Sequence, residues 1–118
     1  MVPETNGNKL LLSDEAKRVY LTYLIGKMIK ILHLIEEEKV TGYSPYAFMV
    51  GQLFEMNAAN ELFDGELVSI IVKLSGVAKE YKEMSFKDIK KQIFEIKRII
   101  KSLIIKYGGE EKEDGKSV

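Results

Sequence analysis

The sequence predicts an all-α fold, a four-helix antiparallel bundle that forms a single domain over residues 1–118. Four short polar signals each precede an apolar run with helical spacing: Ser13-Asp14, Ser44-Pro45, Asp64-Gly65 and Ser85-Phe86. A short side-chain oxygen at such a position can accept a hydrogen bond from a free N–H group of the first helical turn. No strand-like alternation lies between these signals, so four helices joined by short connections are expected to pack antiparallel.

The two ends of the chain are expected to lie outside the bundle. Residues 1–9 hold Pro3, Gly7 and two asparagines, which predicts a loose leader. The polar, acidic segment 109–118 is expected to be a disordered tail. The ordered core is therefore predicted for residues 10–108.

The first helix is expected over residues 14–38, because its apolar side chains recur three and four positions apart. Only a narrow strip of this helix is polar. Its members are Thr22, Gly26, Lys30, His33 and Glu37. A polar face so narrow predicts that other helices or a second subunit cover most of the helix.

The second helix is expected over residues 44–63, with serine as its cap and proline at the first helical position. Between Val40 and Asn60 the only charged residue is Glu55. A surface helix normally carries charge on its outer face, so this helix either lies inside the fold or faces a partner. We favour an exposed apolar patch that contacts a second subunit or another protein. The residues expected to make this contact are Tyr46, Met49, Leu53 and Phe54.

The third helix is expected over residues 66–82 and the fourth over residues 85–107. Gly76 interrupts the third helix, where glycine costs about 1 kcal/mol relative to alanine, so tight packing is expected around it. The fourth helix has an apolar seam with coiled-coil-like spacing, and Gly108-Gly109 is expected to end it. The seam consists of Ile89, Ile93, Ile96, Ile100, Leu103 and Tyr107.

A basic face lies opposite the seam of the fourth helix. Residues 85–107 include seven basic and two acidic residues, a local net charge of +5 in a chain whose formal charge is zero. The face consists of Lys87, Lys90, Lys91, Phe94, Arg98 and Lys101. Lysines can neutralise phosphates while an exposed ring stacks on an unpaired base, so this face is a candidate nucleic-acid site. The alternatives are a solvated lysine face, contact with an acidic protein, and contact with the chain's own acidic tail.

No catalytic, cofactor-binding or metal-binding residue is predicted. The chain has no cysteine and His33 is its only histidine, so a metal site built from several such ligands is not expected. The serines before the helices are explained as caps. The glycines form neither a P-loop nor a G-x-G-x-x-G fingerprint.

No membrane contact is expected, because the densest apolar stretch is interrupted by Lys27, Lys30 and His33. The polar N-terminal residues lack the pattern of a signal peptide, which predicts a cytoplasmic protein. The isoleucine- and lysine-rich composition favours an AT-rich or heat-loving source.

The expected function is non-enzymatic protein–protein contact through the second helix, as a homodimer, an adaptor or a small subunit of an assembly. The alternative is a nucleic-acid-binding module that uses the basic face of the fourth helix.

Overall fold

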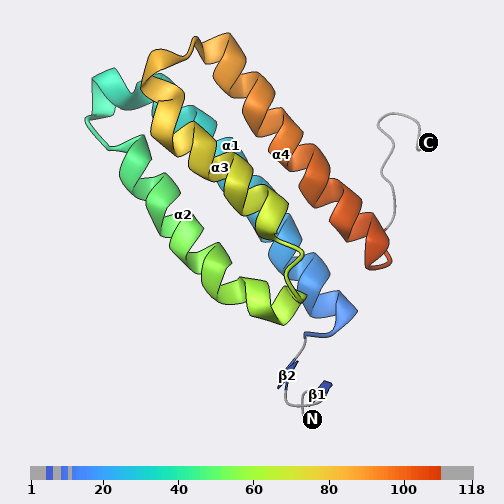
Figure 1. The fold of residues 1–118 in the computed structure, drawn as a ribbon. Coiled ribbons are helices and arrows are strands. Elements are labelled where there is room, and N and C mark those ends of the chain that lie inside the picture. The colour runs from blue at the N-terminus through green and yellow to red at the C-terminus, as the bar shows by residue number, and fades with distance from the viewer. Residues whose placement is uncertain (1–4, 7–8, 11, 110–118) are drawn as a thin grey trace, which may run out of the picture.

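In the computed structural model the protein is a four-helix bundle, as the sequence predicts (Figure 1). The structure describes residues 5–6, 9–10 and 12–109. The helices are α1 (Asp14–Thr41), α2 (Pro45–Ala59), α3 (Val68–Glu80) and α4 (Phe86–Lys106). Two 3-10 turns, η1 (Asn60–Phe63) and η2 (Tyr81–Glu83), continue α2 and α3.

Two short strands precede the first helix. β1 (Thr5–Asn6) and β2 (Lys9–Leu10) pair antiparallel, so the leader contains a small pairing that the sequence did not predict. The predicted acidic tail, apart from Gly109, lies outside the described residues. No helix in the described part of the chain is both long and apolar enough to cross a membrane.

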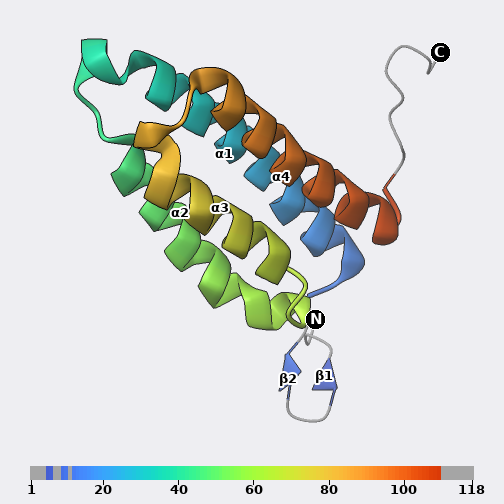
Figure 2. The same ribbon diagram turned by 45° about the horizontal axis from the view of Figure 1, so that its top comes forward.

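The four helices form a ring in chain order. α1 packs against α2 and α4, and α3 packs against the same two helices. α2 and α4 therefore occupy opposite corners of the bundle (Figure 1, Figure 2). Because of this arrangement, the outward side of α2 and the outward side of α4 are separate surfaces.

Three of the four predicted helix starts are confirmed. The hydroxyl oxygens of Ser13, Ser44 and Ser85 accept hydrogen bonds from backbone N–H groups three residues later, at 3.1, 3.2 and 3.1 Å. Each serine thereby satisfies one of the N–H groups that a first helical turn leaves without a partner.

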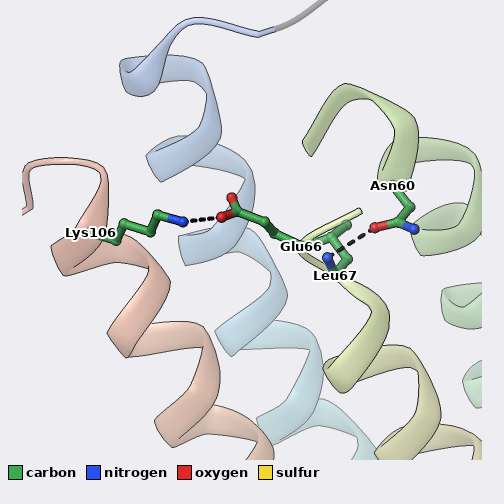
Figure 3. A network of polar contacts seen from close by, with 4 residues as sticks. All are labelled: Asn60, Glu66, Leu67 and Lys106. Atoms are coloured by element: carbon green, nitrogen blue, oxygen red, sulfur yellow. Dashed lines mark hydrogen bonds and ion pairs between the residues drawn. The ribbon is translucent and has the colours of Figure 1, made fainter. Parts of the chain in front are cut away.

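The fourth predicted start, Asp64-Gly65, is a turn rather than a cap. Both residues have positive φ, 53° and 83°, and α3 begins only at Val68. The first turn of α3 is held instead by Asn60, whose side-chain oxygen accepts a hydrogen bond from the Leu67 N–H at 2.9 Å (Figure 3). The neighbouring Glu66 pairs with Lys106, which ties this turn to the end of α4 (Figure 3).

The core lies between the four helices and includes most of the predicted seam of α4. Ile93, Ile96 and Ile100 are fully buried, and Ile89 and Tyr107 are nearly so. They pack with buried side chains of the other helices. These include Leu21, Leu24, Met28, Ile31, Met49, Met56, Ile70 and Leu74.

Gly108 ends the fourth helix as predicted, and Gly42 ends α1 in the same way, whereas the prediction for Gly76 is wrong. Gly42 and Gly108 have φ of 78° and 95°, the left-handed conformation that allows a helix to stop. The tight packing predicted around Gly76 is wrong, because a Cβ atom built there meets nothing within 4 Å. The glycine leaves open space on the surface of α3.

Candidate functional site

The outward side of α2 is uncharged and exposed. We define the α2 outer face as the exposed residues Tyr46, Ala47, Gly51, Phe54, Asn57 and Ala58. Phe54 is 73% exposed and Tyr46 is 51% exposed. An aromatic ring left in water on an uncharged helix face is typical of an interaction surface.

Two of the four residues predicted for this contact lie elsewhere. Met49 is fully buried in the core of the chain, so its assignment to an exposed patch is wrong. Leu53 is partly buried and packs against the same core. Phe54 remains on the surface, because it lies five residues from Met49 and about 140° away around the helix. Tyr46 also remains exposed, although it is only three residues from Met49 and lies at the edge of the buried side.

The one charged residue of α2 points toward α1 and not toward solvent on the outer face. The carboxylate of Glu55 accepts hydrogen bonds from the hydroxyls of Tyr20, at 2.8 Å, and Tyr23, at 3.1 Å. Burial, and then the hydrogen bond to Glu55, raise the pKa of Tyr20 above its ordinary value. Glu55 therefore fastens α2 to α1, and the outer face is left without charge.

The α2 outer face places small residues next to its exposed ring. Gly51 lies three residues before Phe54, and a Cβ atom built on it meets nothing within 4 Å, so the backbone there faces open space. Ala47 lies one turn before Gly51 and is also small and exposed. A partner could therefore approach the backbone of α2 closely beside Phe54.

The outward side of α4 has the opposite character. All six residues predicted for the basic face are exposed: Lys87, Lys90, Lys91, Phe94, Arg98 and Lys101. Phe94, in the middle of this face, is 48% exposed. The six residues thus lie on the surface of α4, and nucleic-acid binding by this surface stays a prediction.

Lysines lie beside aromatic rings along α4, at the basic face and at its edge, where Lys97 and Phe86 adjoin it. The Nζ atom of Lys97 lies 5.0 Å from the ring centroid of Phe94, and that of Lys90 lies 5.9 Å from the ring centroid of Phe86. Arg98 forms a 3.9 Å ion pair with Glu95, and both side chains remain exposed. Such an exposed pair contributes little to stability, so the charges of this face are available to a ligand.

Other candidate chemistry is sparse in the described residues. His33 is exposed on α1, beside a shallow hollow that Gly26, Ile29 and Lys30 also line. Among residues 12–109, no three histidine, aspartate or glutamate side chains gather where they could hold a metal ion.

The chain has no significant match among protein-family models, curated proteins or solved structures.

Proposed function

We propose that this protein acts by protein–protein contact, without enzymatic activity, and that it forms a homodimer through the α2 outer face. The observation that carries the proposal is the exposure of Phe54, 73% in solvent on a helix side without charge. Exposed phenylalanine on such a face gains free energy when a partner removes it from water.

The surface is large enough to contribute to a stable contact. On the α2 outer face Tyr46 and Phe54 are 51% and 73% exposed, which leaves roughly 190–310 Å² of aromatic side chain in water. A specific interface of standard size covers about 800 Å² on each partner. The small exposed residues of the α2 outer face extend its uncharged area toward that size.

A second copy of the chain fits this face because the face is complementary to itself. In a two-fold symmetric dimer the same patch meets on both partners. Phe54 is exposed on the face, and Gly51, one turn before it, has no side chain and faces open space. Two antiparallel α2 helices would each place the ring of Phe54 against the bare backbone at Gly51 of the other copy. The absence of charge on the face removes the like-charge repulsion that self-association would otherwise create.

The oligomeric state of a Phe54→Asp variant tests the proposal. The wild-type chain is expected to be a dimer by sedimentation velocity over a wide concentration range. Phe54→Asp is expected to be a folded monomer with unchanged helicity, because the exposed ring contributes little to the core. Phe94→Asp is the matched control: it changes an exposed phenylalanine on α4 and should leave the dimer intact. A wild-type chain that is monomeric at every concentration would contradict the homodimer.

A further inference from the structure

We infer that the basic face of α4 binds single-stranded nucleic acid, a function separate from the contact through α2. The inference rests on the placement of exposed cations and exposed rings on one helix side. It does not depend on the dimer, because α4 and α2 lie at opposite corners of the bundle.

The charge of the face fits an extended polyanion. Five cations from Lys87 to Lys101 lie on one side of α4 along roughly 20 Å of helix axis. Lys87, Lys90, Lys91 and Lys101 make no ion pair with any residue of the described part. Such a row of lysines attracts a phosphate backbone, and binding gains free energy from the counterions that it releases.

The rings on this face favour a single strand over an acidic protein. Phe94 lies among the lysines, and Lys97 approaches its ring to 5.0 Å. An unpaired base can stack on that ring while neighbouring ammonium groups contact the adjacent phosphates. A duplex presents no free base faces, whereas every nucleotide of an unpaired strand offers one next to a phosphate. The face combines the two features that nonspecific single-strand sites share.

Recognition at this site is expected to be tolerant of sequence. The chain has only one guanidinium on the face, Arg98, and it is paired with Glu95. Paired hydrogen bonds from arginine to guanine are the commonest way in which proteins read bases. Lysines hold phosphates without reading bases, so binding should depend on strandedness and salt more than on base order.

The first experiment measures fluorescence anisotropy of a labelled, mixed-sequence single-stranded DNA at several salt concentrations. The double variant Lys90→Glu, Lys101→Glu is expected to lose at least tenfold in affinity. It should also reduce the slope of log affinity against log salt by about 1.4, since each phosphate contact on a single strand contributes about 0.7. The matched control is Lys73→Glu, Lys79→Glu on α3, which makes the same charge change outside the face and should retain the salt slope.

A second variant separates stacking from charge attraction. Phe94→Ser is expected to weaken single-strand binding roughly 5- to 150-fold, the range of one lost base–ring stack, with an unchanged salt slope. Phe54→Ser, which removes a more exposed ring from α2, should bind as the wild type does.

Three outcomes would overturn the inference. The first is the absence of single-strand binding at low salt. The second is equal affinity for single-stranded and duplex DNA, which would indicate phosphate attraction alone. The third is tight binding of poly-glutamate that Phe94→Ser leaves unaffected, which would assign the face to an acidic protein. Because Phe54→Asp tests the dimer and these variants test α4, either proposal can fail without the other.

Discussion

The α2 and α4 helices are alike on their inward sides and opposite on their outward sides. Inward, each contributes buried side chains to the same core, Met49 and Met56 from α2 and the isoleucine seam from α4. Outward, α2 presents Phe54 on an uncharged face, and α4 presents lysines around Phe94. Since the fold constrains only the inward halves, the outward halves are the part of each helix that is free to serve binding. The difference between them is the basis of the two kinds of partner that we propose.

The largest expected effect is a loss of stability that distinguishes the buried side of α2 from its exposed side. Met49→Asp would place a carboxylate among fully buried side chains, where loss of the methionine alone costs about 2–5 kcal/mol and the unpaired charge adds to it. We expect this variant to lose cooperative thermal unfolding by circular dichroism. Phe54→Asp, one turn away and exposed, should keep the wild-type unfolding transition of the monomer. If both variants remain folded, Met49 is not a core residue.

An intermediate effect on the free energy of unfolding is expected when the one charged residue of α2, Glu55, is compared with a lysine of α4. Glu55→Ala removes the acceptor of two tyrosine hydrogen bonds that join α1 to α2, and is expected to lower the free energy of unfolding by about 1–2 kcal/mol. Lys91→Ala removes an exposed charge of α4 and should change that free energy by less than about 0.5 kcal/mol. Urea denaturation of both variants makes the comparison. Equal stabilities would mean that Glu55 is as dispensable to the fold as a surface lysine.

The sequence predicted α4 more fully than α2 for a physical reason. On α4 the inward residues are apolar and the outward ones are charged. The helical spacing alone therefore places Ile93 on the buried side and Lys91 on the exposed side. On α2 both sides are apolar, and the period cannot tell which side is buried. The pattern therefore assigns Met49 and Phe54 to one contact surface, although Met49 is buried and Phe54 is exposed.

The start of α3 shows a second limit of sequence reasoning. A cap can be recognised in the sequence when the acceptor immediately precedes the helix, as Ser13, Ser44 and Ser85 do. For α3 the acceptor is Asn60, seven residues before the N–H group that it binds. Only the turn through Asp64 and Gly65, with its two positive φ angles, brings these groups together. A contact made by a loop in this way leaves no fixed spacing in the sequence.

The smallest expected effect concerns Gly51, the open glycine of the α2 outer face, and tests whether a partner packs against it. Glycine inside a helix is less stable than alanine by about 0.5–1 kcal/mol, so Gly51→Ala and Gly26→Ala should each raise the free energy of unfolding by that amount. Neither new methyl group meets an atom within 4 Å in the folded chain. Measured in the Phe54→Asp background, where association is removed, the two variants should be equally stabilised.

In the otherwise wild-type chain these two variants should differ, because only Gly51 lies where Phe54 of a second copy would pack. Gly51→Ala should weaken the dimer by sedimentation equilibrium, whereas Gly26→Ala on α1 should leave it unchanged. Gly26 and Gly51 are equally open and exposed in the folded chain, so a difference between them in association would have to come from a partner. Close approach of a second α2 helix would produce that difference, and an unchanged dimer in Gly51→Ala would contradict it while leaving Phe54 as the anchor of some other contact.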